Sequence, residues 1–390
     1  MPTVKQASSQ FTLDDHKYMA LAIELAKKGH YTTSPNPRVG CVLVNNNQII
    51  GQGFHAKAGL AHAEVNALAE AKKHYPELIQ GATAYVTLEP CSHTGRTPPC
   101  AQKLIDAKVA RVVSAMVDPN PKVSGRGLKM LSDQGIVAQS GLLAAEASLL
   151  NVGFIKRMTV KVPYVRCKLA ASLDGKTAMQ SGESKWITAN EAREDVQRLR
   201  AQSCAVIAGA DSVLFDNAKM NLRWSQLGYL AKTYPENKLR QPLRVIIDSQ
   251  HRLTPSLELF KQESPILIVQ TFAETHLENQ QQWPHFVEHI QVKATYDNKV
   301  CLRELLAVLA KREINEVLIE SGAKLAGAFI EQDLVDELIL YQAGKLIGGD
   351  GKNLVEMPSI QSLSQAKQLK INDVRMLGRD IKITAKFERE

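Results

Sequence analysis

The sequence has few cysteines, few aromatic residues and no long apolar run. Six cysteines in 390 residues are too few for a disulfide scaffold, a feature of small secreted domains. Aromatic residues make up 5% of the chain, and the 48 Lys and Arg residues are scattered, which disfavours a nucleic-acid groove. No segment approaches the roughly 20 apolar residues of a membrane span. We therefore expect a globular, cytoplasmic protein with no nucleic-acid or membrane partner.

The length and the net charge limit the remaining possibilities. A chain of 390 residues predicts two or three domains, each large enough for its own core. The formal net charge of +8 suits phosphate-bearing small molecules, although a solvated basic surface explains it as well. Residues 1–10 are polar and lack an apolar signal core, so we expect them to be a disordered extension.

The most informative stretch runs from Ala61 to Cys100. It contains His62-Ala63-Glu64 and then Pro90-Cys91, and eight residues separate Cys91 from Cys100. One histidine and two cysteines supply three ligands for a tetrahedral zinc ion and leave a fourth position for water. Glu64 is a nearby carboxylate that can move protons without binding the metal. This combination is the signature of the zinc-dependent deaminases.

The local pattern sets a geometric condition on this site. His62 and Glu64 would lie about 200° apart around an ideal helix, so the metal must sit beyond the end of the helix expected at 63–73. Pro98 and Pro99 suit the first turn of a second helix. Cys100 would then lie near a helix N-terminus, which favours a thiolate. His93 is a further candidate ligand, to which we assign a role either in supporting the zinc ligands or toward the substrate.

Strand and helix patterns alternate along the whole chain, which predicts an α/β fold. In the first half, strands are expected at 41–44, 48–54, 81–88, 110–117 and 136–138, and helices at 13–28, 63–73 and 128–134. In the second half, strands are expected at 164–171, 204–209, 244–247, 266–269, 317–320 and 337–343, and helices at 190–201, 302–311 and 324–332. Residues 146–163 read as the linker, and we place the domains at 11–157 and 158–390.

Several polar groups at strand ends are candidates for ligand binding, each with an ordinary alternative. Gly322 follows a strand and precedes a helix, which suits a pyrophosphate but also fits a plain connection. Ser249 and Arg252 could meet a 2′-phosphate. Arg200 and Arg223 could clamp a phosphate, although composition alone would make them surface residues.

Two further positions remain open in the same way. Asn36, in the rigid turn before residue 41, could hold the polar edge of a pyrimidine, and ordinary turn chemistry explains it equally well. Asp248 could cap a turn rather than contact a ligand.

With these residues in view, the chain resembles, over nearly its whole length, the bifunctional deaminase–reductases of riboflavin biosynthesis. The motifs that carry the resemblance are Asn36-Pro37-x-Val39-Gly40, His62-Ala63-Glu64, Glu89-Pro90-Cys91-Ser92-His93-x-Gly95-Arg96-Thr97-Pro98-Pro99-Cys100, Lys168-x-Ala170-x-Ser172-x-Asp174-Gly175, Ser184-x-Trp186-Ile187-Thr188 and Leu334-Val335-Asp336-Glu337-Leu338. The long spacer between the two cysteines is the most specific of these features, because nucleobase deaminases in general have Cys-x-x-Cys.

The resemblance implies a three-layer domain similar to cytidine deaminase, followed by an α/β domain similar to dihydrofolate reductase. The first would deaminate 2,5-diamino-6-ribosylamino-4(3H)-pyrimidinone 5′-phosphate. The second would use NADPH to reduce the ribosyl side chain, giving 5-amino-6-(5-phosphoribitylamino)uracil. The implied partners are this phosphorylated pyrimidine and further copies of the chain, in a homo-oligomer that is a dimer or a tetramer.

The resemblance also implies a role for individual residues. Zinc, one ion per chain, would be held by His62, Cys91 and Cys100, with Glu64 as the catalytic residue. The residues implied to bind NADPH are Ala170, Trp186, Ser212, Asp216, Ser249, Gly322, Ala323, Lys324, Leu325, Ala326, Gly327 and Ala328. The residues implied to bind substrate are Asn36, His93, Ser184, Arg200, Met220, Arg223 and Glu320.

Two other functions are compatible with the zinc motif. One is a nucleobase or tRNA deaminase joined to a separate binding domain, which the cysteine spacing and the scarcity of stacking aromatics disfavour. The other is a non-catalytic, zinc-stabilised binding module, in which Glu64 would be dispensable.

Overall fold

The computed structural model describes residues 11–92, 98–121, 123–272 and 282–388. The chain divides into two compact units, Met1–Val160 and Lys161–Glu390, and we describe each by itself. The expected extension at residues 1–10 lies outside the described residues. Within the described ranges, none of the helices combines the length and the apolar character that crossing a membrane would require.

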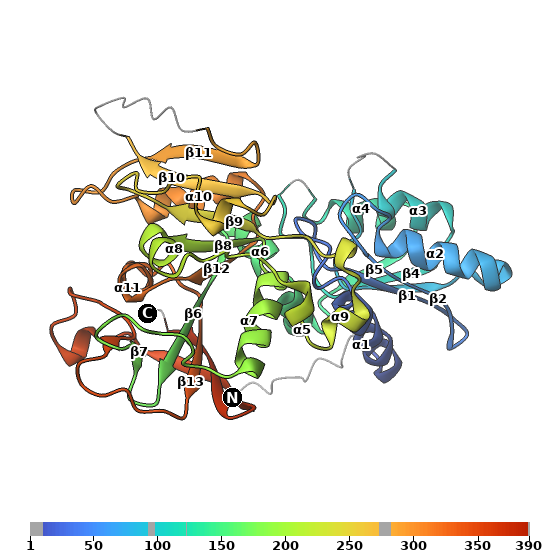
Figure 1. Ribbon diagram of the computed structural model, residues 1–390. Coiled ribbons are helices and arrows are strands. Elements are labelled where there is room, and N and C mark those ends of the chain that lie inside the picture. Colours follow the sequence, from blue (N-terminus) through green and yellow to red (C-terminus); the bar gives the residue numbers. More distant parts are fainter. Residues whose placement is uncertain (1–10, 93–97, 122, 273–281, 389–390) are drawn as a thin grey trace, which may run out of the picture. The chain divides into compact units, whose positions relative to one another are not determined.

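The first unit is built on a five-stranded mixed sheet with the strand order β2-β1-β3-β4-β5 (Figure 1). Its strands are β1 Gly40–Asn45, β2 Gln48–Phe54, β3 Thr83–Val86, β4 Arg111–Ser114 and β5 Val137–Ser140. The β1–β2 hairpin turns at Asn46 and Asn47, which both have positive φ, as a tight two-residue hairpin turn requires. β1 runs antiparallel to β2 and β3, whereas β3, β4 and β5 are parallel.

Helices cover both faces of this sheet, which makes three layers. They are α1 Leu13–Lys27, α2 Ala63–His74, α3 Cys100–Asp106, α4 Arg126–Asp133, α5 Ala144–Leu150 and α6 Val152–Val160. Because side chains alternate along a strand, Cys41 and Leu43 face the core under α2, α3 and α4. Val42 and Val44 face the core under α1 and α5. The continuous apolar run of this strand therefore reflects burial on both faces.

Two glycines set how closely the helices approach the sheet. A Cβ atom on Gly40 would lie 1.9 Å from the carbonyl oxygen of Ala22 in α1. A Cβ atom on Gly53 would lie 2.3 Å from the carbonyl oxygen of Ala63 in α2. Only glycine permits backbones to approach this closely. The contact at Gly53 holds the N-terminus of α2, and with it the His62-Ala63-Glu64 motif, directly on the sheet.

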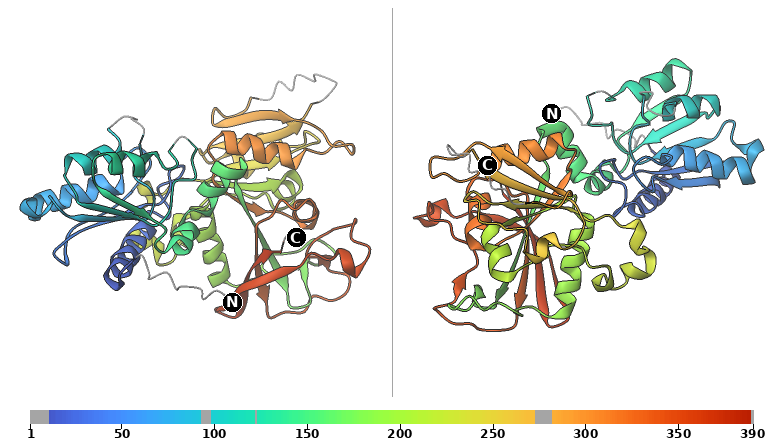
Figure 2. Two further views of the ribbon diagram at one scale, coloured as in Figure 1. Left: turned by 180° about the vertical axis from the view of Figure 1, so that it is seen from behind. Right: turned by 45° about the horizontal axis from the view of Figure 1, so that its top comes forward.

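The second unit has a nine-stranded sheet with the order β11-β10-β9-β8-β12-β6-β13-β16-β15. Its strands are β6 Tyr164–Ser172, β8 Ala205–Gly209, β9 Leu243–Ile247, β10 Ile266–Thr271, β11 Val287–Val292, β12 Glu316–Glu320, β13 Glu337–Ala343, β15 Leu369–Leu377 and β16 Asp380–Phe387. The strands from β11 to β13 are parallel, and β13, β16 and β15 are antiparallel. Figure 2 shows the red C-terminal strands beside the green strand β6.

Helices also cover both faces of the second sheet. They are α7 Asn190–Gln202, α8 Ala210–Asp216, α10 Leu302–Lys311 and α11 Ala323–Glu331, with short α9 Leu230–Thr233 in a connection and a small sheet of β7 Lys176–Ala178 and β14 Lys352–Asn353 beside the main one. Val317 and Ile319 of β12 face the core under α10 and α11. Leu318, between them, faces the core under α7 and α8. Both units therefore confirm the α/β prediction.

The structure corrects two local expectations. Residues 146–163 contain the division between the two units, as expected of the linker, but α5 and α6 occupy most of the segment and Phe154 of α6 is buried. Pro98 and Pro99 do not form the first turn of α3, since Pro99 is its N-cap and Cys100 its first residue. The strands β15 and β16 and the helix α8 were not predicted from the sequence.

A buried ion pair joins α1 to the sheet of the first unit. Asp15 accepts hydrogen bonds from Arg111 at 2.6 Å and from the Tyr85 hydroxyl at 2.7 Å, and it completes the capping box of α1 with Thr12. Burial opposes ionisation, but the bonds from Arg111, the Thr12 backbone and Tyr85 together hold the pKa of Asp15 well below its ordinary value.

We predict that Asp15→Asn lowers the free energy of unfolding of the first unit by about 2 kcal/mol at pH 7. A lowered folded-state pKa gives stability that is present above the unfolded pKa of about 3.9 and is lost as pH falls. The deficit of the variant should therefore shrink below about pH 4. Denaturant unfolding followed by hydrogen exchange in peptides of this unit measures both effects. Glu24→Gln, which breaks an exposed pair with Lys27 on the same helix, should change stability by less than about 0.5 kcal/mol.

Candidate functional sites

The three predicted zinc ligands converge in the first unit. His62 is the N-cap of α2 and has an extended backbone (φ −74°, ψ 168°), so it lies outside the helix. The Nδ1 atom of His62 lies 3.3 Å from the Sγ atom of Cys100 and 3.8 Å from that of Cys91. All three ligand atoms lie within 4.8 Å of one another. The condition that the metal sits beyond the end of α2 is therefore met.

These separations fit a zinc ion. Tetrahedral zinc has Zn–S bonds of about 2.3 Å and Zn–N bonds of about 2.0–2.1 Å, which places a nitrogen and a sulfur ligand about 3.6 Å apart. The two measured N–S separations lie on either side of this value. Two thiolates and an imidazole are also the ligand types that zinc prefers. Across the described ranges, this is the one group of three or more His, Cys, Asp or Glu side chains suited to a metal.

The site stabilises negative charge on sulfur before any metal binds. A hydrogen bond from the Cys100 thiol, followed by one from His62, lowers the pKa of Cys91 to about 4. The backbone N–H of Cys100, at the start of α3, also donates to the Cys91 sulfur at 3.2 Å. Cys91 is therefore a thiolate at neutral pH, the form that binds metal.

Glu64 lies beside the three ligands but is not one of them. It occupies the first turn of α2, and its side chain is only 3% exposed. Burial, and next the negative charge of Cys91, raise the pKa of Glu64 to about 7. A carboxyl group with this pKa can both accept and return a proton near neutral pH.

Glu89 fixes the backbone turn that leads into Cys91. One of its carboxylate oxygens accepts from the N–H groups of Asp118 (3.0 Å) and Gly125 (2.9 Å), and the other from Gly127 at 2.8 Å. A Cβ atom on Gly127 would lie 1.9 Å from the carbonyl oxygen of Pro90. Glu89 was noted only as part of a motif, but its carboxylate anchors the turn that presents Cys91 against the start of α4.

Asn36 reaches the metal site through His55, a residue that the sequence analysis missed. The Asn36 amide donates to Nε2 of His55 at 3.1 Å, and Nδ1 of His55 donates to the carbonyl of Ala61 at 3.1 Å. Burial lowers the pKa of His55, which keeps the ring neutral and fits this pattern of donors. The His55 ring lies 5.2 Å from that of His62. No motif contains His55, so the sequence offered no signal for it. His93 lies outside the described residues.

A charged cluster occupies the carboxyl end of β12 and β6 in the second unit. Glu320 and Lys168 are opposite each other on these neighbouring strands and face α7. Arg200 of α7 forms a bidentate pair with Glu320, at 2.6 and 2.9 Å, and also donates to the carbonyl of Asn221 at 2.7 Å. Carboxyl ends of parallel strands are where ligands bind in such sheets. Lys168 was quoted only as part of a motif, and its alignment with Glu320 becomes visible in the strand register.

The charges of this cluster interact with one another. Burial, and next the positive charge of Arg200, lower the pKa of Arg223, and Arg193 acts in the same direction. Burial lowers the pKa of Lys168, which Glu320 partly offsets. Arg200, Arg223 and Lys168 thus lie around one carboxylate, Glu320, an excess of positive charge that suits an anionic ligand.

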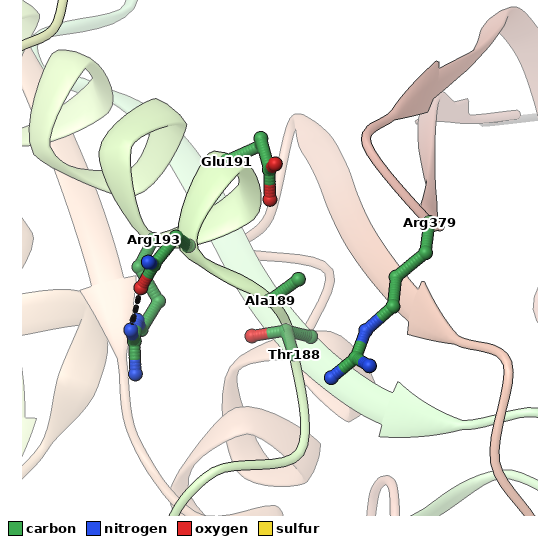
Figure 3. A pocket seen from close by; sticks show the side chains of 6 residues that line it. Thr188, Ala189, Glu191, Arg193 and Arg379 are labelled. Atoms are coloured by element: carbon green, nitrogen blue, oxygen red, sulfur yellow. Dashed lines mark hydrogen bonds between the residues drawn. The ribbon is translucent and has the colours of Figure 1, made fainter.

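Other predicted residues of the second unit lie around this cluster. The Trp186 ring is 60% exposed and stacks against the guanidinium of Arg193 at 4.3 Å. Lys185 donates to the backbone carbonyl of Asp216 at 3.3 Å, which ties Asp216 to the residue before Trp186. Arg193 also lines a pocket of about 430 Å³ with Thr188, Ala189, Asn190, Glu191 and Arg379 (Figure 3). The half-buried Ser184 and Ala170 belong to the adjoining loop and to β6.

The expected pyrophosphate turn is present at the start of α11. Gly322 is the N-cap of this helix, and its N–H donates to the hydroxyl of Ser212 at 3.3 Å. Ala326 and Gly327 point into the protein instead, since Ala326 is fully buried and a Cβ atom on Gly327 would lie 1.8 Å from the carbonyl oxygen of Glu356. The N-terminal residues of the 322–328 segment are therefore the ones available to a ligand.

Of the polar residues that follow β9, Asp248 takes part in forming a turn. Asp248 accepts from the N–H groups of Arg252 and Leu253, both at 3.0 Å, so it caps a turn as one alternative predicted. The Ser249 hydroxyl accepts from the N–H of Val300 at 3.2 Å. The guanidinium of Arg252 pairs with Asp211.

Comparisons with known proteins first define the class. Residues 12–116 match the family model described as the cytidine and deoxycytidylate deaminase zinc-binding region, and residues 163–383 match the RibD C-terminal domain. The chain thus combines a zinc-binding deaminase region with a RibD-type reductase domain.

Similarity over the full length then identifies the family. The chain is 48% identical to riboflavin biosynthesis protein RibD of Haemophilus influenzae, over 96% of this chain and 98% of the relative. It is 47% identical to RibD of Escherichia coli, over 95% of this chain and 98% of the relative. The structure of Acinetobacter baumannii RibD (form 1) aligns with a TM-score of 0.86 at 42% identity, covering 96% of this chain and 99% of that one. The chain belongs to the RibD family, and the expected fold class is confirmed.

We predict that the purified chain carries one zinc ion and that Cys91→Ser or Cys100→Ser reduces this to less than about one tenth, because either change leaves two ligands. Elemental analysis after dialysis measures the ratio. Cys41→Ala, in the core of the same unit, and Cys301→Ser, in the other unit, should keep the full zinc content. Full zinc content in Cys100→Ser would contradict the assignment.

Proposed function

We propose that the chain is the bifunctional deaminase–reductase of riboflavin biosynthesis. Its first reaction is the hydrolytic deamination of 2,5-diamino-6-ribosylamino-4(3H)-pyrimidinone 5′-phosphate. Its second is the NADPH-dependent reduction of the deaminated product to 5-amino-6-(5-phosphoribitylamino)uracil. The observation that carries the proposal is the convergence of His62, Cys91 and Cys100 beside the buried Glu64. A Thermotoga maritima diaminohydroxyphosphoribosylaminopyrimidine deaminase/5-amino-6-(5-phosphoribosylamino)uracil reductase is 32% identical, with a TM-score of 0.83.

In the first reaction the chain supplies ligands, proton transfer and orientation. His62, Cys91 and Cys100 would hold zinc, which supplies an acidified water in its open position. Glu64 accepts the two protons of the attacking water in turn, giving the first to the ring nitrogen and the second to the departing amine, which leaves as ammonia. The pair of Asn36 and His55 borders the same space and would hold the polar edge of the pyrimidine. His93 is retained as a proposed substrate contact.

We predict that Glu64→Gln abolishes ammonia release, by at least about 10³-fold, while zinc content and reductase activity remain those of the unaltered chain. Glutamine keeps the size of the side chain but cannot exchange the proton. A coupled ammonia assay with the diaminopyrimidine phosphate measures the loss, and NADPH oxidation by the same sample is the internal control.

The same assay separates the alternatives. Ammonia release from cytidine or RNA, and none from the pyrimidine phosphate, would favour the nucleobase or tRNA deaminase. An unchanged rate in Glu64→Gln would exclude the catalytic role and favour a zinc-stabilised binding module.

In the second reaction the charged cluster would bind the phosphorylated substrate. Arg200 and Arg223 offer guanidinium groups to the phosphate, and the pair with Glu320 fixes the orientation of Arg200. Glu320 and Lys168 lie at the strand ends, where they can reach the sugar hydroxyls. Ser184 and Met220 complete the proposed substrate set.

NADPH would lie along the neighbouring strand ends and supply a hydride to the opened ribosyl carbon. The first-turn N–H groups of α11, in Ala323, Lys324 and Leu325, suit its pyrophosphate, and Gly322 is the N-cap residue through which the backbone approaches it. Ser212, Asp216, Trp186 and Ala170 would border the cofactor. Ala326, Gly327 and Ala328 would contribute through the packing of the helix rather than by contact. Ser249 would meet the 2′-phosphate.

We predict that the chain prefers NADPH to NADH and that Ser249→Asp lowers kcat/KM for NADPH at least about tenfold while leaving that for NADH within about twofold. The reason is repulsion between the new carboxylate and the 2′-phosphate. Steady-state kinetics with each cofactor provide the comparison, and Ser256→Asp, at an exposed position on the following loop, controls for the added charge. Equal use of NADH and NADPH by the unaltered chain would refute the role of Ser249.

The domain boundaries, the cellular location and the partners of the chain are also proposals. The domain boundaries at 11–157 and 158–390 differ by three residues from the division at Val160 and Lys161. A cytoplasmic location is supported by six cysteines that form no disulfide, which suits a reducing compartment. We further propose that the chain acts as a homo-oligomer and binds no nucleic acid. Exposed Ile371, Val374 and Met376 on the edge strand β15 support self-association.

A further inference from the structure

Arg244 is a buried arginine that binds carbonyl groups instead of a carboxylate. It lies on β9, faces the α7 side of the sheet and is 0% exposed. Its Nη1 donates to the carbonyls of Lys219 (3.1 Å) and Leu259 (2.6 Å). Its Nη2 donates to those of Gln262 (3.0 Å) and Ser264 (2.8 Å). Burial lowers the pKa of Arg244 to about 10, so it remains a cation at neutral pH.

An apolar side chain would fill this position without the cost of burying a charge. The two terminal nitrogens of Arg244 instead bridge two separate loops, residues 217–223 and residues 258–264. The amide of Asn221 joins the same loops by donating to the side chain of Gln262. Arg244 thus ties residues 217–223, which have no strand or helix ladder to fix them, to a segment that contains the short 3-10 helix Glu258–Phe260.

The segment Lys219–Arg223 is held almost entirely by side chains from other elements. Gln241 accepts from the N–H of Leu222 at 2.8 Å and donates to its carbonyl at 2.9 Å. Gln197 of α7 accepts from the N–H of Arg223 at 2.9 Å. Within the segment, Met220 has a positive φ of 53°, a conformation that non-glycine residues adopt only when their surroundings impose it.

This segment carries and contacts the groups that bind the substrate in the proposed function. Arg223 stands at its end, within electrostatic reach of Arg200 and Glu320. Asn221, in its middle, accepts a hydrogen bond from Arg200 at 2.7 Å. A shift of the Lys219 carbonyl would therefore move both arginines that face the substrate phosphate.

We propose that Arg244 is a positioning residue of the reductase site: its guanidinium fixes the 219–223 segment and thereby places Arg223 and Arg200 for the phosphate of the substrate. The inference rests on the proposed reductase function. It adds a residue that touches neither substrate nor cofactor and acts through the backbone of Lys219.

The test is Arg244→Lys, because lysine keeps the charge but cannot span four carbonyl groups in two loops. We expect the KM for the deaminated pyrimidine phosphate to rise about tenfold, while kcat and the KM for NADPH stay within about twofold. The KM for the same substrate without its phosphate should not change. Deaminase activity of the same chain provides the internal control.

Arg166→Met is the matched control. Arg166 is another buried arginine of this sheet, pairs with Glu316 and Glu337, and makes no contact with the 219–223 segment in the part of the chain that the structure describes. This variant should be less stable but should leave the KM for the phosphorylated substrate unchanged. Where Arg244→Lys does not fold, Gln241→Met removes both bonds to Leu222 and should raise the same KM.

The possible results are distinct. An unchanged KM for the phosphorylated substrate in folded Arg244→Lys, or in Gln241→Met, would overturn the inference and leave the proposed function standing. An equal change with and without the phosphate would also overturn it, since it would indicate a general distortion. No NADPH oxidation by the unaltered chain would overturn the proposed function and this inference with it.

Discussion

The deaminase half depends on the meeting of two helix N-termini at one end of the sheet. The first residue of α3 and the residue that precedes α2 bring Cys100 and His62 together, and the turn after β3 adds Cys91. Close contacts set the backbone before two of these ligands, His62 and Cys91. The glycine of β2 lets α2 lie on the sheet, and the Glu89 carboxylate holds the turn before Cys91 by accepting backbone N–H groups. These contacts help to bring the three ligands together.

The same arrangement separates binding from proton transfer. The N-cap backbone of His62 directs the imidazole beyond the end of α2, whereas Glu64 remains in the first turn and is buried. On a regular helix, His62 and Glu64 would point to different sides. Because His62 is the N-cap, His62 instead serves as a metal ligand and Glu64 as the neighbouring acid. In the reductase unit, too, the secondary structure brings the site residues together. The strand register places Glu320 opposite Lys168, and α7 brings Arg200 onto Glu320.

Much of the fold and of the zinc site could be predicted, because the sequence patterns that indicate them are local. The strand β13 and the helix α10 lie at the residues that their patterns predicted, since their apolar positions repeat with a clear period. The zinc ligands were predictable because three reactive residue types occur at a specific spacing. The edge strand β15 escaped prediction because none of its side chains is buried, so burial leaves little pattern in its sequence.

Other features could not be predicted because they depend on contacts between distant parts of the chain. His55 gains its position from Asn36 and Ala61, and Arg244 gains its role from carbonyls that converge only in the folded unit. Side chains that bind backbone groups carry no motif, since any loop offers carbonyls and amides. Sequence patterns therefore indicated which residues perform the chemistry, and the structure adds the residues that hold them.

The central claim is that one imidazole and two thiolates bind zinc and leave one coordination position to solvent. Zinc-edge X-ray absorption spectroscopy on the purified full chain tests it most directly. The account predicts two sulfur atoms at about 2.3 Å, one nitrogen at about 2.0–2.1 Å and one further light atom from water. A third sulfur, a second histidine in the coordination shell, or protein that does not retain zinc would contradict it.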